Sequence, residues 1–421
     1  MIEATLEAIE AGITLIMGYS SSSLALSAGN LGKVYDIAQF TDAASTGLIS
    51  KQREYPFLSR MNINSKSSAM GVKNSILHYA SIQDGWRNVA VIGKPDRFSL
   101  DAAVSFINAA EPELKILTFQ QFLVGATEFD IELREIRNSG ARVIVAFLSF
   151  EWSNFVAQAD EFGLVGDNYV YYVPSTVVAI PLINNTLSRG AIGYNVFVPS
   201  DTPQLSLFEE LWASADPEEF PQAGGPFNPF QLLAYDTMLG VAHAMAKLES
   251  DGKLHGRIGA ELWFNTIRSL EYQATTGLVS FDENGDRIAD IEFLYYSPED
   301  GWIRTAQYSD DGYSVINDVV WNSGSTAVPD LDIRDPFHYW SCHDGDDAID
   351  KTGKTVTIHT PDGSDIDDID IDYHCDTFID CQNYSDETNE CGNNYLLVFI
   401  VFGIITGALI LLALANIAFV I

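Results

Sequence analysis

The chain has 421 residues, and its 58 acidic and 23 basic side chains give it a formal net charge of −35. That length is enough for two or three domains with cores of their own. The charge argues against nucleic acid and against an anionic lipid surface as partners, because both need basic residues to neutralise phosphates. It favours a solvated acidic exterior or cationic partners.

Short apolar strands alternate with amphipathic helices over the first half of the chain. The strands are predicted at Ile13–Gly18, Ile37–Phe40, Val89–Gly93, Ile116–Phe122, Val143–Leu148, Tyr169–Val173 and Ala191–Val198. The helices between them are predicted at Ser22–Tyr35, Ser65–Asp84, Ser99–Ala110, Glu128–Ser139 and Glu151–Phe162. This alternation is typical of βαβ units, so the predicted fold class is α/β with parallel sheets.

Hydroxyl side chains follow the first two strands. The first strand runs into Ser20–Ser23 at the start of a helix, and the second is followed by Ser45 and Thr46. Ligands of parallel sheets bind beyond the carboxyl ends of the strands, and free amides at a helix start favour an anion. These serines could therefore hold a ligand carboxylate. Alternatively, they are ordinary N-caps and loop residues.

The second half of the chain has a different pattern. Helix Gln231–Leu248 is apolar over much of its surface and is expected to be buried. The run GLVSFDENGDR then predicts a hairpin with Asn284 and Gly285 at its turn. Two further strands are predicted at Ile291–Tyr296 and Trp302–Tyr308. The segment from 330 to 394 is rich in aspartate and poor in apolar residues, which indicates a separate module or stalk.

The last segment, Tyr395–Ile421, carries no charged residue and is long enough to cross a bilayer as a helix. All four cysteines lie in the acidic stretch before it. This layout predicts that the preceding part of the chain stands in an oxidising exterior compartment. The first residues lack the basic and apolar regions of a signal peptide, so the chain is expected to be incomplete at both ends.

An ordered series of motifs resembles one receptor family. The runs are GYSSSSLALSAG, TDAASTGL, YPFLSRMN and DGWRNVAVIG, followed by RVIVAFLSFEW, LLAYDTMLGVAHAMAKL and GLVSFDENGDR. Together they resemble the ligand-binding ectodomain of family C G-protein-coupled receptors, above all the metabotropic GABA receptors. The run LALANIAF near the end resembles the first membrane helix of that family.

This resemblance implies a two-lobed type I periplasmic-binding fold, the Venus flytrap. Lobe 1 would take residues 1–62, without the first two strand–helix units of the family, and residues 199–280. Lobe 2 would take residues 63–198 and return strands at 281–312. A linker would follow at 313–341, a cysteine-rich module at 342–391 and one transmembrane helix at 395–421.

The resemblance also implies where a ligand would bind. In metabotropic GABA receptors, serines of the first two loops hold the ligand carboxylate, and those places are filled here by Ser20 or Ser21 and by Ser45. Asn62 stands where the family has a histidine, and Phe150, or Ser149 with a one-residue gap, stands where it has an aromatic residue. The carboxylate half of the family site is therefore retained.

The amine half of the site departs from the family pattern. Phe230 replaces the glutamate that pairs with the ligand amine, and Thr176 takes roughly the place of a tryptophan. This departure puts GABA itself in doubt as the ligand. Glu151 is the nearest carboxylate that could replace the lost one, although a solvated glutamate at a helix start is the alternative. Asp236 belongs to a motif common to the fold and is expected to be structural.

The run CDTFIDCQNYSDETNEC resembles the second half of a low-density-lipoprotein receptor class A repeat, which holds Ca²⁺. The resemblance implies the disulfides Cys375–Cys391 and Cys342–Cys381, with one family bridge absent. It implies calcium ligands at Asp376, Asp380, Asp386 and Glu387. Hard oxygen ligands of this kind suit Ca²⁺. The alternative is an acidic disulfide-linked stalk without a metal.

The function predicted from these features is that of a receptor, and no spacing of residues specifies catalysis. The chain is expected in the plasma membrane with its N-terminal part extracellular, with glycosylation sequons at Asn184 and Asn383. It would bind a small amino-acid-like or anionic ligand, form a homo- or heterodimer, and signal through a heterotrimeric G protein. The alternatives are a single-span receptor with an intracellular enzyme, such as a receptor guanylyl cyclase, and a membrane-tethered solute-binding protein.

Overall fold

A computed structural model describes residues 2–183 and 185–332, and beyond them only four short strands. Residues 1–332 form one compact unit and residues 333–421 a second. The strands of the second unit are β15 (Tyr339–Ser341), β16 (Ile358–His359), β17 (Asp365–Ile366) and β18 (Asp368–Asp370). They pair antiparallel, β15 with β18 and β16 with β17.

Several predictions fall on residues that the structure does not describe. These are the membrane segment at 395–421, the pairs Cys375–Cys391 and Cys342–Cys381, the calcium ligands Asp376, Asp380, Asp386 and Glu387, and the sequons at Asn184 and Asn383. Within the described residues, no helix combines the length and the apolar surface needed to cross a membrane.

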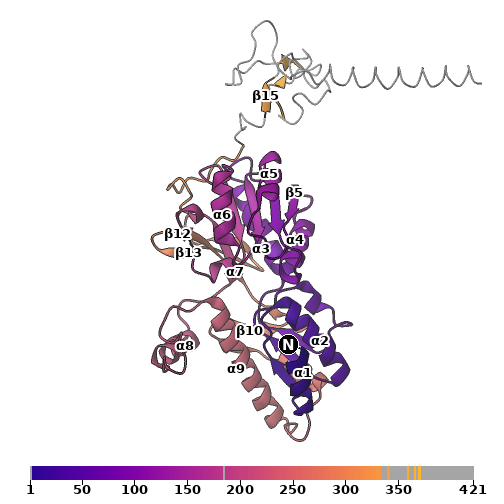
Figure 1. Cartoon of the computed structure of the whole chain (residues 1–421). Coiled ribbons are helices and arrows are strands. Elements are labelled where there is room, and N and C mark those ends of the chain that lie inside the picture. The colour runs from indigo at the N-terminus through magenta and orange to yellow at the C-terminus, as the bar shows by residue number, and fades with distance from the viewer. Residues whose placement is uncertain are drawn as a thin grey trace, which may run out of the picture. The chain divides into compact units, whose positions relative to one another are not determined.

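One lobe of the first unit, drawn in the lower part of Figure 1, contains two small sheets. The parallel sheet has the order β1-β2-β3, with strands Leu15–Met17, Ala38–Thr41 and Leu58–Arg60. The antiparallel sheet has the order β11-β10-β9, with strands Arg287–Ile288, Gly277–Phe281 and Tyr272–Ala274. The helices of this lobe are α1 (Ile2–Glu10), α2 (Ser22–Tyr35), η1 (Gly47–Ser50), α8 (Pro203–Ser214), α9 (Pro229–Ser250) and α10 (Ala260–Arg268).

The other lobe contains one mixed sheet of eight strands in the order β14-β13-β12-β8-β7-β6-β4-β5. Its parallel part comprises β4 (Asn88–Gly93), β5 (Lys115–Gln121), β6 (Val143–Phe147), β7 (Val170–Val173) and β8 (Ile192–Val196). Its antiparallel part comprises β12 (Ile291–Ser297), β13 (Gly301–Ser309) and β14 (Gly312–Val315). Its helices are α3 (Ser65–Tyr79), α4 (Arg97–Ala110), α5 (Asp130–Asn138), α6 (Trp152–Glu161), α7 (Ser175–Val178) and η2 (Asn185–Ser188).

Alternate residues of the central strands face two different helical layers. In β4, Val89 and Val91 belong to the core that includes α3 and α4, whereas Ala90 and Ile92 belong to the core that includes α5 and α6. All four residues are fully buried. A strand covered on both faces needs apolar residues throughout, which is why these strands appear as continuous apolar runs in the sequence.

The predicted α/β class is confirmed, and α2 has the predicted bounds. Sequence reasoning missed several short or peripheral elements, namely α1, η1, β3, α7, η2, α8, α10, β9 and β14. It missed β3 because the strand is only three residues long and contains Arg60, a residue type that is rarely buried.

The hairpin after α9 corrects two expectations. Phe281 pairs with Arg287, so five residues connect the strands where a tight turn at Asn284 was predicted. The carboxylate of Asp282 accepts the backbone amides of Asn284 and Asp286, at 2.8 and 3.0 Å, and stabilises this longer loop. The hairpin also stays in the small sheet, and the chain enters the large sheet only at Ile291, ten residues after the predicted position of 281.

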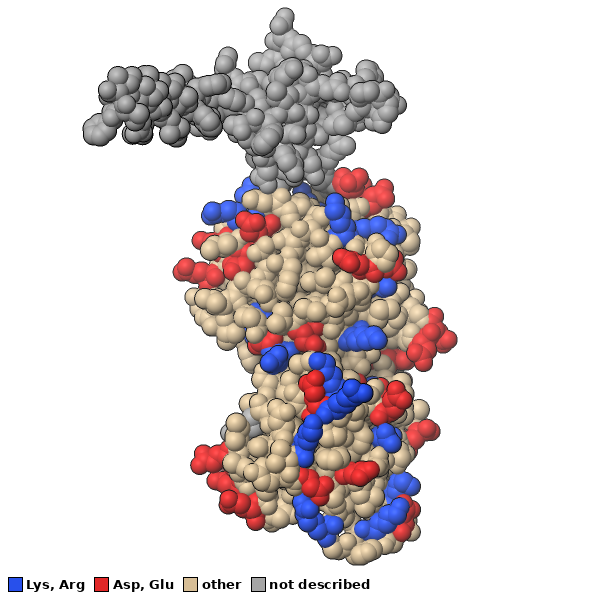
Figure 2. All heavy atoms as spheres, turned by 90° about the vertical axis from the view of Figure 1, so that its right-hand side faces the viewer, with Lys and Arg blue, Asp and Glu red and all other residues tan. Residues whose placement is uncertain are grey.

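Charged side chains of both signs are interspersed over the face shown in Figure 2. A few charged residues are buried instead, among them Arg60, Asp236, Asp286, Arg287 and Glu292. Each of these five side chains makes a hydrogen bond or an ion pair with another residue. Burial of a charge is costly unless it is paired in this way, so these residues hold specific parts of the fold together.

Candidate functional site

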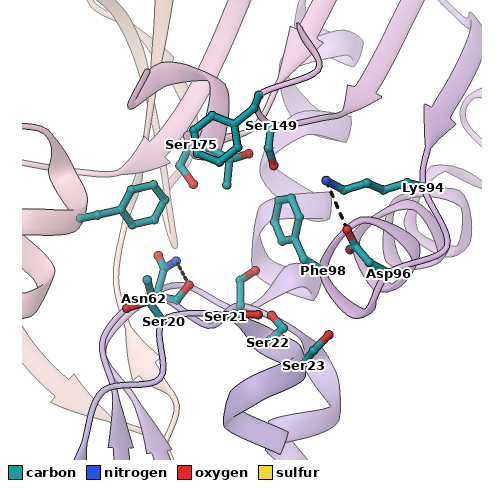
Figure 3. A pocket seen from close by; sticks show the side chains of 15 residues that line it. Ser20, Ser21, Ser22, Ser23, Asn62, Lys94, Asp96, Phe98, Ser149 and Ser175 are labelled. Atoms are coloured by element: carbon teal, nitrogen blue, oxygen red, sulfur yellow. Dashed lines mark hydrogen bonds and ion pairs between the residues drawn. The ribbon is translucent and has the colours of Figure 1, made fainter. Parts of the chain in front are cut away.

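A cavity of about 560 Å³ lies between the two lobes of the first unit. Lobe 1 contributes Ser20–Ser23, Ala43, Ser45, Asn62 and Phe230, and lobe 2 contributes Lys94, Asp96, Phe98, Ser149, Phe150, Ser175 and Thr176. Figure 3 shows Ser21–Ser23 on one side of this cavity and Ser149 and Ser175 on the other. Of the six predicted ligand residues, five line the cavity, and Glu151 does not.

The chain enters the first serine loop through an unusual turn. Gly18 and Tyr19 have φ angles of 106° and 61°, in the left-handed region that a tyrosine rarely adopts. Ser21 is the N-cap of α2, which agrees with the alternative that these serines are ordinary N-caps. Its side chain, however, makes no capping hydrogen bond. The Ser20 hydroxyl donates to Asp42 at 2.9 Å. Ser21, together with the first amides of α2, is therefore better placed than Ser20 to hold an anion.

The second loop is held from behind by two side chains. The guanidinium of Arg60 donates to the carbonyl oxygens of Ser45 and Thr46, at 2.9 and 2.7 Å. The amide of Asn62 donates to the carbonyl of Ala43 at 2.8 Å and accepts the backbone amide of the next residue. Asn62 is thus committed to positioning the loop that carries Ser45.

Lys94 provides a positive charge at the lobe 2 wall, and two carboxylates neutralise it. Its ammonium lies 2.8 Å from Glu151 and 3.4 Å from Asp96. Burial acts to lower the pKa of Lys94, but the hydrogen bond and charge of Glu151, with those of Asp96, outweigh burial and raise it. Burial likewise acts to raise the pKa of Glu151, and Lys94 outweighs it and lowers that pKa. Both groups are charged at neutral pH.

The remaining walls combine three aromatic rings with the hydroxyls of Ser149, Ser175 and Thr176. Phe98, Phe150 and Phe230 all line the cavity, and the side chain of Phe150 is 84% exposed. Thr176 donates its hydroxyl to the carbonyl of Leu148 at 2.7 Å. An exposed phenylalanine at a cavity wall has apolar surface that a ligand could cover.

Sequence reasoning did not single out Lys94, Asp96, Phe98 or Ser175. A local signal for two of them was available, because Lys94 directly follows the carboxyl end of β4 and Ser175 lies just beyond β7. Those strand ends meet at the edge of the sheet where ligands bind. Among the described residues, no histidine, cysteine or carboxylate cluster of three or more is arranged to hold a metal.

Comparison with known proteins gives one matching family model and distant plant relatives. Residues 2–298 match the model described as the receptor family ligand binding region. Glutamate receptor 3.1 of Oryza sativa subsp. japonica is 22% identical over 68% of this chain and 33% of its own length. Glutamate receptor 2.1 of Arabidopsis thaliana is 27% identical over 48% of this chain and 22% of its own length. The chain thus spans a third or less of these relatives.

Proposed function

The chain belongs to the family of receptor ligand-binding regions, and we propose on that basis that its first unit binds a small amino-acid-like or anionic ligand between its two lobes. The observation that carries the proposal is the convergence of Ser21, Ser45 and the start of α2 on one cavity with residues of the opposite lobe. The carboxylate of the ligand would lie at the start of α2, where backbone amides and hydroxyls can donate to it.

Binding between the lobes would favour their closed arrangement. Hydrogen bonds already join the lobes, among them those from the Gly47 amide to Asp101 at 2.7 Å, from the Ser65 amide to the carbonyl of Ser45 at 2.8 Å, and from Asn228 to the carbonyl of Ala179 at 3.3 Å. A ligand that contacts both lobes has more contacts when they are closed, so it shifts the population towards that state. Such closure is a conformational signal and involves no chemical step, so we propose that this region is not an enzyme.

Replacing Ser21 and Ser45 together by alanine should weaken binding of the tightest-bound amino acid by about 10- to 100-fold, the loss expected for buried hydrogen bonds to a charged group. Isothermal titration calorimetry with GABA, L-glutamate and L-phenylalanine on the 421-residue chain would measure this. Ser27→Ala is the matched control, since that hydroxyl bonds to the Ser23 carbonyl on the same helix. An affinity unchanged in the double variant would contradict the proposed carboxylate site.

We further propose that the whole receptor acts in the plasma membrane, with this region outside the cell, as a homo- or heterodimer that activates a heterotrimeric G protein in the manner of metabotropic GABA receptors. The ordered motifs and the run LALANIAF support this reading. The names of the plant relatives mention glutamate, which makes L-glutamate one of the acids that the binding experiment has to include. Ligand-dependent nucleotide exchange on a G protein would test the proposed G-protein signalling. Elevated cyclic GMP without such exchange would favour the guanylyl cyclase alternative, and solute uptake would favour a tethered solute-binding protein.

The cysteine-rich module is proposed to hold Ca²⁺ through Asp376, Asp380, Asp386 and Glu387. Support comes from the resemblance to a class A repeat and from the mutual repulsion of carboxylates that a cation would relieve. An oxidised peptide of residues 335–392 should show amide shifts at these four positions on titration to millimolar Ca²⁺, the range of extracellular modules. Asp386→Ala should abolish the shifts, and an unchanged spectrum of the parent peptide would contradict the site.

A further inference from the structure

We propose that the cavity selects small monocarboxylates with an apolar body, such as an apolar amino acid, and discriminates against dicarboxylates such as L-glutamate. This inference rests on the proposed function and specifies its ligand class. It follows from three features of the cavity: a single place for an anion, a lysine that is already neutralised, and aromatic walls.

The place for a carboxylate is on lobe 1. Ser21 begins α2 without a capping bond from its side chain, and Ser22 and Ser23 occupy the first turn of that 14-residue helix. Ser45 lines the same cavity on the neighbouring loop. These groups together suit one carboxylate.

A second carboxylate would need a second cationic group. Lys94 is the only lysine or arginine among the residues that line the cavity, and its side chain is 12% exposed. It lies 2.8 Å from Glu151 and 3.4 Å from Asp96, so the three groups together carry a net negative charge. A distal ligand carboxylate near Lys94 would be the third carboxylate around one ammonium, and it would be repelled by Glu151 and Asp96. That arrangement is unfavourable.

Three aromatic rings on the rest of the cavity wall suit an apolar group, and the hydroxyls of Ser149, Ser175 and Thr176 beside them carry no positive charge for a second carboxylate. Phe98, Phe150 and Phe230 come from different segments of the two lobes and line one space. Phe150 is 84% exposed, so an apolar ligand body would remove a large aromatic surface from water. A charged distal group in contact with these rings would instead lose its hydration without a partner.

The test compares two ligands and one charge-changing variant by calorimetry on the 421-residue chain. L-Phenylalanine should bind at least about tenfold more tightly than L-glutamate, the size of discrimination expected when a polar group is left unpaired. Glu151→Gln releases Lys94 from one carboxylate, so it should raise the affinity for L-glutamate about tenfold. The preference for L-phenylalanine over L-glutamate should therefore become smaller. Phe150→Ala should weaken binding of L-phenylalanine and not that of L-glutamate.

The matched control is Glu113→Gln, which makes the same charge change in the Lys73–Glu113 pair of the same lobe, outside the cavity. It should leave the preference unchanged. If L-glutamate binds more tightly than L-phenylalanine while Ser21→Ala/Ser45→Ala still weakens it, the inference about ligand class is wrong and the proposed function stands. An unchanged preference in Glu151→Gln would also overturn the inference. If neither acid binds, the inference about ligand class is wrong, and the titration with GABA then tests the proposed function.

Discussion

Replacing Asp286 by asparagine should lower the free energy of unfolding of the first unit by about 3–5 kcal/mol, the range for removing one partner of a buried ion pair. The Asp286 carboxylate accepts a hydrogen bond from the Arg60 Nε at a distance of 2.7 Å, and the Arg60 side chain is completely buried. The variant leaves this guanidinium charged and without its anion. Urea unfolding followed by circular dichroism would measure the change.

The control for this prediction is Glu299→Gln, which removes an equally short ion pair with Arg189 at 2.6 Å. Glu299 is exposed, so its substitution should change stability far less. In the double variant Arg60→Met with Asp286→Leu, neither charge of this pair remains, so part of the lost stability should return. The rest should stay lost, because the carbonyls of Ser45 and Thr46 no longer have the Arg60 donor. If Asp286→Asn unfolds like the parent protein, the pair does not hold the fold together.

The second large effect is expected for Asp236→Ala, which should also cost about 3–5 kcal/mol. Asp236 is fully buried, and its two carboxylate oxygens accept four hydrogen bonds from the amides and hydroxyls of Thr275 and Thr276, at 2.5–2.9 Å. Its removal leaves these donors unsatisfied and also removes a negative charge that supports the buried Arg287.

Thr237→Ala is the control for Asp236→Ala, because Thr237 is the next residue of the same helix and is equally buried. Its hydroxyl bonds only to the Leu233 carbonyl, so its loss should cost about 1 kcal/mol. The free energies of unfolding of the two variants, measured by thermal and urea unfolding, should therefore differ clearly. Equal stabilities would show that the carboxylate is not essential, against the structural role that the sequence predicted for Asp236.

Local pattern was sufficient for much of the fold. The bounds of α2 and of the central strands could be predicted because the spacing of apolar residues that marks them is contained within a short stretch of sequence. The position of Ser21 and Ser45 beyond neighbouring strand ends predicted that they would meet, and both line the cavity. Asn62 and Phe150 also line it, at positions that family resemblance implied. Ligand contact at these residues remains a prediction.

The sequence by itself determined the α/β class and the hydroxyl side chains after the first two strands. The structural role of Asp236 stays a prediction, which its hydrogen bonds to Thr275 and Thr276 support. Only the tertiary structure decided the charge and lining of the site. Glu151 pairs with Lys94 across 57 residues, which removes it as a free partner for a ligand amine, and Arg60 meets Asp286 across 226 residues. The physical reason is that the chain passes several times between the lobes and so brings distant segments together. Pairs formed in this way do not depend on the local periodicity of the sequence, so that periodicity cannot predict them.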